Sequence, residues 1–404
     1  MAEEAQRLSM PLRGVRVLEM GSLLAGPFCG QMLADFGAEV IKVEPPGQGD
    51  PMRQWGRQYN GRGLWWPIIA RNKKSITLDL RKPEGRELAL RLAERCDVVV
   101  ENFRPGTLER WGLGYEELSG RNPGLILVRV SGYGQTGPYR DKAGFGGVAE
   151  AMGGLRYITG YPDRPPTRVG ISIGDTLAGT LGALGALLAL RHREVRGGRG
   201  QVVDVAIFEA VLTYMESLIP EYALAGYVRE RSGSVLPGIA PSNIYPTADG
   251  TWVVMGANAD NVFRRLCQAM GRPEMADDPR FCDHHARGRH MELLDSIIAE
   301  WTSRYPVQEL LRILDEAGVP AGRIYTAREM LEDPHFRARE DIVWVPAPGI
   351  GPLPMQNVFP KLAATPGRVR WAGAELGEHN EEVFGGLLGL PEAEMARLRE
   401  LGVL

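Results

Sequence analysis

The first half of the chain alternates short apolar runs with segments of helical character. Between the runs, helices are expected at 28–36, 82–96 and 108–111, with Pro27 and Pro83 in the first turns of two of them. Regular alternation of strands and helices predicts an α/β fold with a mostly parallel sheet and helices on both faces. The expected strands are residues 15–20, 39–44, 75–80, 97–101, 125–130 and 202–205.

The second half predicts a separate, smaller α/β segment. A helix from about 208 to 227 is expected to link it to the first half, and the Pro- and Gly-containing stretch 237–250 marks a change of composition. A chain of 404 residues also exceeds the usual size of a single hydrophobic core, so two domains are expected. The predicted elements of the smaller segment are strands at 251–255 and 323–325 and helices at 261–270, 293–305 and 307–317. The C-terminal tail is expected to contain a strand at 342–345 and two helices after Gly377.

Two segments stand apart from this periodic pattern. Residues 47–66 are rich in Gly, Arg and aromatic residues and have no sustained period, which predicts a long surface excursion that covers a site or a partner chain. Residues 131–138 form a polar, glycine-rich loop directly after a predicted strand. Open α/β sheets place ligands at that end of their strands, so this loop is a site candidate.

Asp175 lies between Gly174 and a run of residues, 176–190, that carries no charge. A single Asp before an apolar helix is often an N-cap that accepts backbone N–H bonds. The same position also suits a carboxylate nucleophile with room for an acyl group beside it. The residues alone leave both interpretations open. The uncharged run is shorter than the ~20 residues that a membrane span needs, so no membrane segment is expected.

Composition favours a small-molecule partner. The formal net charge of -3 gives no global field for nucleic acid or an anionic membrane. Residues 1–7 lead into no apolar segment, so a secretory signal is not expected. Four scattered cysteines without a CxxC pair fit reduced thiols. We therefore expect a cytoplasmic protein.

Motifs for other chemistries are missing. The first strand–helix turn lacks the G-x-G-x-x-G order of a dinucleotide site. Cys282, His284, His285 and His290 lie close in sequence, but their spacing matches no established zinc pattern, so no metal is expected. Basic residues near strand ends suit a phosphorylated ligand, although surface Lys and Arg are common. These include Arg81, Arg104, Arg110 and Lys142.

Several segments together resemble the class III coenzyme A transferases, the family of formyl-CoA and carnitine CoA-transferases that is related to α-methylacyl-CoA racemase. The likeness spans nearly the whole chain, and the order of the segments is more specific than any one of them. The segments are 24–29, 37–44, 72–76, 101–106, 132–138, 174–175 and 200–205.

The resemblance implies that Asp175 is the catalytic aspartate and that CoA is a substrate, with no tightly bound cofactor. It implies an interlaced, ring-like homodimer whose Rossmann-like large domain is formed from both chain ends. The expected domains are thus 1–205 (large, first part), 206–235 (linker helix), 236–330 (small) and 331–404 (return to the large domain). The implied CoA site comprises Leu24, Ala25, Leu78, Asp79, Arg81, Asn102, Phe103, Arg104, Arg110, Lys142, Ala143, Gly144 and Phe145.

The expected reaction is transfer of CoA between small carboxylic acids, with dicarboxylates of succinate, malate, citramalate or glutarate type as the first hypothesis. Gly134, Gln135 and Arg168 are the candidate acid-binding residues. The alternatives are 2-methylacyl-CoA racemisation and a non-catalytic acyl-CoA-binding protein. In the racemases a histidine stands where this chain has Phe145, which cannot transfer a proton.

Two departures concern the formyl-CoA transferases. The chain lacks their long glycine-rich loop near 237–246, and Pro45 replaces an arginine that contacts CoA. Formyl or oxalate specificity is therefore not expected.

Overall fold

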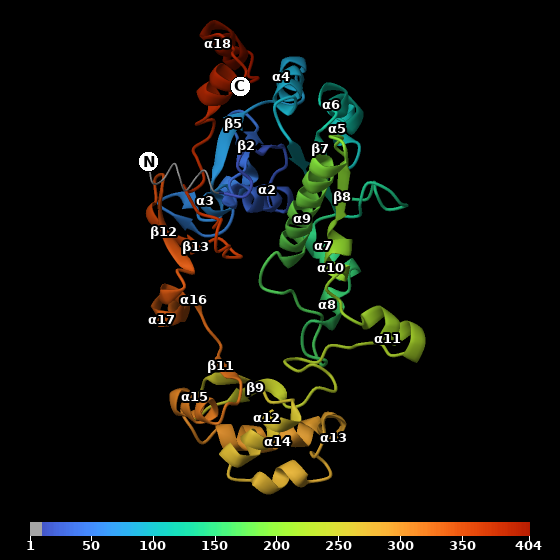
Figure 1. Cartoon of the computed structure of the whole chain (residues 1–404), viewed down its shortest axis with the longest axis vertical. Coiled ribbons are helices and arrows are strands. Elements are labelled where there is room, and N and C mark those ends of the chain that lie inside the picture. The colour runs from blue at the N-terminus through green and yellow to red at the C-terminus, as the bar shows by residue number, and fades with distance from the viewer. Residues whose placement is uncertain (1–9) are drawn as a thin grey trace. The chain divides into compact units, whose positions relative to one another are not determined.

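The computed structural model describes residues 10–404, which form two compact units (Figure 1). The larger unit contains described residues up to 155, together with 169–217 and 335–404. The smaller unit contains 156–168 and 218–334. The chain thus enters the smaller unit twice, and its C-terminal segment belongs to the larger one.

A six-stranded, fully parallel sheet is the centre of the larger unit. Its spatial order is β5-β2-β1-β6-β7-β8, the doubly wound order in which the direction of winding reverses between β1 and β6. The mixed α/β fold with a central parallel sheet is therefore confirmed. The strands are β1 (Arg16–Glu19), β2 (Glu39–Glu44), β5 (Lys73–Thr77), β6 (Val98–Glu101), β7 (Ile126–Ser131) and β8 (Val202–Ala206).

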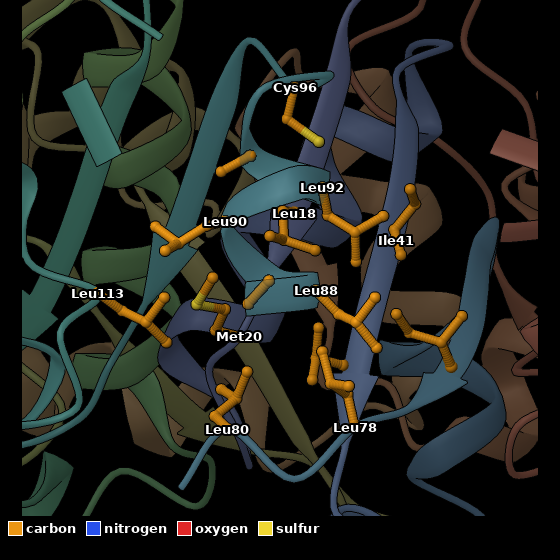
Figure 2. Packing of buried hydrophobic residues seen from close by; sticks show 14 of the residues in the cluster. Leu18, Met20, Ile41, Leu78, Leu80, Leu88, Leu90, Leu92, Cys96 and Leu113 are labelled. Carbon is orange, nitrogen blue, oxygen red and sulfur yellow. The ribbon is translucent and has the colours of Figure 1, made fainter. Parts of the chain in front are cut away.

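Helices cover both faces of this sheet. On one face, Leu88 and Leu92 of α4 (Pro83–Ala93) point toward Leu18 and Ile41 of the strands, as Figure 2 shows. The π-helix η3 (Glu381–Leu387) and α18 (Glu392–Glu400) join the same core, which ties the end of the chain to the sheet. Helices α5 (Thr107–Arg110) and α6 (Tyr115–Arg121) lie at this core, while α2 (Ala25–Asp35), α7 (Gly146–Met152), α9 (Ile173–Arg196) and α10 (Ile207–Leu212) cover the other face.

Helix α9 packs closely on α2 because its inner face carries small residues. A Cβ added at Gly179 would lie 2.8 Å from the carbonyl oxygen of Ala25, and one at Gly182 would lie 3.3 Å from the Sγ of Cys29. Among the described residues, α9 is the one helix with the length and hydropathy of a membrane span. The helix extends beyond the uncharged run 176–190 at both of its ends. Core helices of soluble proteins have the same properties, and this helix packs against α2 and β7.

One sequence-based expectation about a connection is wrong. The single helix expected over 208–227 is two helices, α10 and α11 (Leu218–Ala225), separated by residues that include Glu216 with a φ of 49°. A helix cannot continue through that left-handed conformation. Most residues of the excursion 47–66 are exposed, as expected, although Asp50 and Met52 are buried. It contains η1 (Pro51–Gln54) and a hairpin of β3 (Gln58–Tyr59) and β4 (Arg62–Gly63), and α3 (Trp66–Ile69) follows.

The smaller unit has its own apolar core, which includes Tyr245, Phe263 and Leu310. An antiparallel sheet of order β11-β10-β9 is formed by β9 (Ser242–Pro246), β10 (Trp252–Gly256) and β11 (Ala321–Arg323). The expected strand at 323–325 therefore ends at Arg323. The helices are α12 (Asp260–Ala269), η2 (Pro273–Asp277), α13 (His284–Arg289), α14 (Met291–Thr302), α15 (Val307–Glu316) and α16 (Ala327–Glu332).

The remaining elements lie near the places where the chain passes between the units or returns to the larger one. An antiparallel hairpin in the returning segment places Trp344 opposite Pro354. These elements are α8 (Leu155–Ile158), α17 (Pro334–Ala338), β12 (Ile342–Ala347) and β13 (Gly351–Gln356).

Candidate active site

A pocket of about 240 Å³ opens at the carboxyl ends of β1, β6 and β7, where the sheet order reverses. Doubly wound sheets bind their ligands at this point. The volume is below the ~300–1,000 Å³ of pockets that enclose whole drug-sized ligands, so it suits one end of a long molecule. Its lining is formed by Ser22, Leu23, Leu24, Ala25, Trp55, Asn102, Phe103, Arg104, Pro105, Val130, Ser131, Gly132, Tyr133, Arg140, Lys142, Gly144, Phe145, Gly146, Asp175 and Ile207.

Asn102 joins the loops that follow β1 and β6. Its Oδ1 accepts a hydrogen bond from the Ser22 backbone N–H at 2.8 Å, and its Nδ2 donates to the Ser22 carbonyl at 2.9 Å. Gly21 permits this approach, because a Cβ there would lie 2.3 Å from Oδ1 of Asn102. The reciprocal pair fixes two walls of the pocket relative to each other.

Asp175 is half-buried in the first turn of α9. The helix begins after the N-cap Ser172, so Asp175 is its third residue and the N-cap interpretation is wrong. The positive end of the helix dipole favours a carboxylate there. Gly146 lies directly against it, because a Cβ on Gly146 would be 2.3 Å from Asp175 Oδ2. The start of α9 is also held from α7, where buried Glu150 accepts a hydrogen bond from Gly174 N–H at 3.3 Å.

The segment between β7 and α7 forms another wall. The backbones of Gly132 and Gly144 touch, since a Cβ on Gly132 would lie 3.0 Å from the Cα of Gly144. The ammonium of Lys142 lies 3.6 Å from the ring centroid of Tyr139. Phe145 is 67% exposed and lines the same pocket as Asp175, so the residue at this position is apolar.

Buried charges support the loop after β6. Glu101 accepts hydrogen bonds from the Phe103 backbone N–H and from Arg129 Nε, both at 2.7 Å. Burial raises the pKa of Glu101 to about 7, although the hydrogen bond and charge of Arg129 oppose that rise. Arg129 also donates to Glu109 at 2.6 Å. The Phe103 backbone is thereby fixed at the pocket.

Most of the CoA-binding residues expected from the resemblance lie together. Those that line one pocket with Asp175 are Leu24, Ala25, Asn102, Phe103, Arg104, Lys142, Gly144 and Phe145.

Other expected residues lie outside this lining. Leu78 is buried in the core, Arg81 is paired with Asp79 at 2.8 Å, and Arg110 donates to Thr107. Ala143 lies between two lining residues without being one of them. Gly134 N–H donates to Ser131, Gln135 N–H donates to Asp204, and Arg168 belongs to the smaller unit.

Several lining residues were not among the residues expected to bind CoA or the acid. Trp55 comes from the excursion 47–66, which was expected to cover a site or a partner chain without any one residue being singled out. Tyr133 belongs to the glycine-rich loop 131–138, which was a site candidate, and Arg140 follows that loop. The three cationic side chains Arg104, Arg140 and Lys142 give the pocket a basic rim suited to phosphate groups. Across residues 10–404, no group of three or more His, Cys, Asp or Glu is arranged to hold a metal ion.

Comparison with known proteins defines the class of this fold and site. Residues 12–380 match CoA-transferase family III, and the chain belongs to that family. A solved CAIB/BAIF family protein from Brucella suis superposes with a TM-score of 0.83 at 34% identity, covering 94% of this chain and 100% of that one. The chain is therefore an enzyme of the class III CoA-transferase type.

Two named relatives refine the comparison. Succinyl-CoA--D-citramalate CoA-transferase of Chloroflexus aurantiacus is 65% identical over 401 residues, which cover 99% of this chain and 100% of that protein. The alpha subunit of succinyl-CoA--L-malate CoA-transferase from Chloroflexus aurantiacus is 42% identical over 398 residues, which cover 98% and 93% of the two chains. The expected resemblance to class III CoA-transferases is confirmed.

Proposed function

We propose that this enzyme transfers CoA from succinyl-CoA to a small dicarboxylic acid of the citramalate type, with Asp175 as the covalent nucleophile. The observation that carries the mechanism is that Asp175 is the only carboxylate among the described residues that line the pocket. The choice of substrates is supported by the names of the relatives, above all the one that is 65% identical.

The first half of the reaction loads CoA onto the enzyme. A carboxylate oxygen of Asp175 attacks the thioester carbonyl of the acyl-CoA, and collapse of the tetrahedral intermediate expels CoA thiolate and leaves a mixed anhydride. The thiolate then attacks the aspartyl carbonyl of the anhydride. This step releases the donor acid as a free carboxylate and leaves an aspartyl-CoA thioester.

The second half reverses these steps with the acceptor acid. Its carboxylate attacks the aspartyl-CoA carbonyl, which releases CoA thiolate and forms a new anhydride. The thiolate attacks the acceptor's acyl carbon, giving the new acyl-CoA and regenerating the carboxylate of Asp175. Each step exchanges one acyl bond for another, so the balanced reaction requires no oxidant and no additional proton.

The pocket supports this chemistry in three ways. Gly146 has no side chain, which lets the carboxylate of Asp175 lie directly against its backbone at the pocket. Backbone N–H groups of the glycine-containing segment 144–147 are proposed to stabilise the tetrahedral oxyanions. The basic rim formed by Arg104, Arg140 and Lys142 is proposed to bind the phosphates of CoA, which enters as a substrate while no cofactor is held tightly.

Phe145 separates this proposal from racemisation. Exchange of a proton at Cα of 2-methylacyl-CoA requires two acid–base groups, and a phenyl ring provides none. Its exposed ring lines the pocket with Asp175. We therefore expect no deuterium incorporation at Cα when the enzyme is incubated with 2-methylacyl-CoA in heavy water.

The enzyme is further proposed to be a homodimer in the cytoplasm, without membrane association. A stripe of exposed apolar side chains on α9 supports dimerisation, since Leu184, Leu188 and Val195 are 49%, 63% and 52% exposed. The near balance of charge and the four unpaired cysteines support the proposed location.

Exchange of CoA between succinyl-CoA and D-citramalate tests the proposal. Asp175→Ala and the similarly sized Asp175→Asn are each expected to lower kcat by on the order of 1,000-fold or more, because neither side chain can form the anhydride. Asp315→Ala, which changes an exposed residue of α15, is expected to retain wild-type rates. Turnover retained by Asp175→Ala would remove the nucleophile assignment.

A further inference from the structure

The loop between β1 and α2 borders the pocket and contains an unusual backbone conformation. Leu23 has a φ of 63°, in the left-handed region that favours glycine. Leu23 and its neighbours Ser22 and Leu24 all line the pocket. A side chain is strained in this conformation, so contacts from outside the loop must stabilise it.

Asp50 provides such a contact from the excursion that follows β2. Its carboxylate oxygens accept the Leu23 backbone N–H at 3.1 and 3.2 Å. Its Oδ1 also accepts the N–H of Met52 at 2.9 Å. The residue is only 2% exposed, so water cannot replace these bonds. A residue 27 positions away along the chain therefore holds the strained peptide.

Lys42 binds both Asp50 and the loop. Its ammonium lies 2.8 Å from Asp50 Oδ2 and donates a hydrogen bond to the carbonyl of Gly21. Burial alone would raise the pKa of Asp50, but the charge of Lys42 and the hydrogen bonds from Lys42, Met52 and Leu23 bring it below its usual value. The carboxylate is thus ionised, and this ion pair contacts the loop on both sides of Ser22.

The same chain of charges continues to the first turn of α2. Glu19 lies 3.4 Å from the ammonium of Lys42 and 2.8 Å from that of Lys73, and Lys73 donates to the carbonyl of Pro27 at 2.6 Å. Two carboxylates and two ammonium groups therefore alternate beneath the loop. Buried ion pairs of this kind add little net stability compared with apolar packing, which favours a role in fixing one conformation.

We propose that Asp50 is a positioning residue for acyl-CoA binding, acting through the backbone of Leu23 to hold the pocket wall formed by residues 22–25. This inference rests on the proposed function, because it assigns the pocket to the acyl-CoA. Asp50 itself does not line the pocket, so its effect reaches the ligand only through the loop.

A double-mutant experiment isolates the backbone effect. Asp50→Asn keeps an oxygen acceptor but loses the ion pair, and we expect it to raise KM for succinyl-CoA about tenfold while kcat changes less than about threefold. Glycine adopts the left-handed conformation without strain. In a Leu23→Gly background, Asp50→Asn should therefore raise KM by less than about threefold. In the Leu23→Ala background, which removes the side chain but retains the strain, the rise should again be about tenfold.

The matched control is Asp35→Asn. Asp35 is 4% exposed and binds Arg71 and Asn72 at 2.6 and 2.7 Å, but it does not contact the β1–α2 loop. We expect this variant to lower Tm without changing KM. Equal KM effects for Asp50→Asn in the Leu23→Gly and Leu23→Ala backgrounds, or an equal KM effect for Asp35→Asn, would overturn the inference.

Calorimetric titration with CoA separates this inference from the reaction itself. A wild-type protein that binds CoA without transferring it would refute the proposed function, while the same double-mutant comparison of Kd would still test Asp50. A wild-type protein that does not bind CoA would overturn both. If Asp50→Asn does not fold, hydrogen exchange of the Leu23 backbone amide in the wild-type protein tests the role of Asp50 instead. We expect strong protection of this amide without ligand, because Asp50 accepts its hydrogen bond. Rapid exchange would contradict the role of Asp50.

Discussion

At the scale of single residues, the contact between Gly146 and Asp175 is the feature on which the proposed chemistry depends. Any Cβ at position 146 would overlap the carboxylate, 2.3 Å from Oδ2 and 2.8 Å from Cγ. The carboxylate would have to move away from the position in which it faces the pocket. Displacements of about 1 Å at a reacting group can cost a factor of ~100 in rate.

We therefore predict that Gly146→Ala lowers kcat for CoA exchange roughly 100-fold while the protein remains folded, as measured by steady-state kinetics and circular dichroism. Gly120→Ala is the matched control. Gly120 is an exposed helical residue with nothing within 4 Å of an added Cβ, so this change should leave kcat unaltered and stabilise α6 by up to about 1 kcal/mol. Normal turnover by Gly146→Ala would contradict the placement of Asp175.

Single residues also show where sequence reasoning was limited. The resemblance located Asp175, Asn102 and Phe145 in one pocket, because these positions belong to ordered motifs. Arg81 lies outside the lining of that pocket, and its guanidinium pairs with the carboxylate of Asp79 two residues earlier. A local ion pair of this kind depends on side-chain direction, which a motif does not specify.

At the scale of elements, the sequence predicted the strands of the large sheet to within three residues at either end, the largest difference being at the end of β5. Continuous apolar runs such as 98–100 can be accommodated only between two covered faces, so the pattern and the structure agree. The hairpin β3–β4 was not predicted, because its strands have two residues each. The break between α10 and α11 depends on the backbone of Glu216, and glutamate gives no sequence signal for a left-handed conformation.

Helix α15 of the smaller unit provides a test of one element through pH. Asp249, in the β9–β10 connection, accepts the Val307 backbone N–H at 3.1 Å and the hydroxyl groups of Thr247 and Thr251. Hydrogen bonds from Thr247, Val307 and Thr251 lower the pKa of Asp249 to about 2. The ionised carboxylate therefore anchors the first turn of the helix.

A group with a lowered pKa stabilises the folded state above its unfolded pKa and loses that contribution as pH falls through the folded pKa. Asp249→Asn should accordingly lower Tm near neutral pH. The difference from wild type should shrink between pH about 4 and about 2, where Asp249 becomes protonated in the unfolded and then in the folded protein. A Tm difference that stays constant over this range would show that ionisation is not involved.

At the scale of the whole molecule, the exposed stripe on α9 requires an explanation. Leu184, Leu188 and Val195 recur at helical spacing on the side of α9 opposite the small residues that pack on α2. A second copy of the chain is the proposed cover. Periodicity alone could not predict this proposed interface. Apolar residues recur at the same helical spacing on a face that packs in the core and on a face that packs against a second chain.

We predict that Leu188→Glu shifts the protein from a dimer to a monomer in light scattering, because a charge would be buried in the proposed interface. Leu401→Glu is the control, since Leu401 is a single exposed apolar residue after α18, and the dimer should persist. A wild-type protein that has the mass of one chain would contradict the dimer proposal.

The boundaries between the two units concern the chain as a whole. The structure changes unit at 217/218 and 334/335, and it adds residues 156–168 to the smaller unit. Sequence composition marked the later break near 237 because Pro and Gly cluster there. Composition did not indicate that residues 156–168 also belong to the smaller unit. Their assignment depends on which residues far apart in the sequence pack together.

The most direct test of the central claim is chemical trapping on the enzyme. The wild-type protein is incubated with succinyl-CoA and hydroxylamine, digested, and analysed by peptide mass spectrometry. An activated acyl group on Asp175 is predicted to appear as a hydroxamate at that residue, and to be missing without succinyl-CoA. An unmodified Asp175 peptide from enzyme that is turning over would contradict the covalent mechanism.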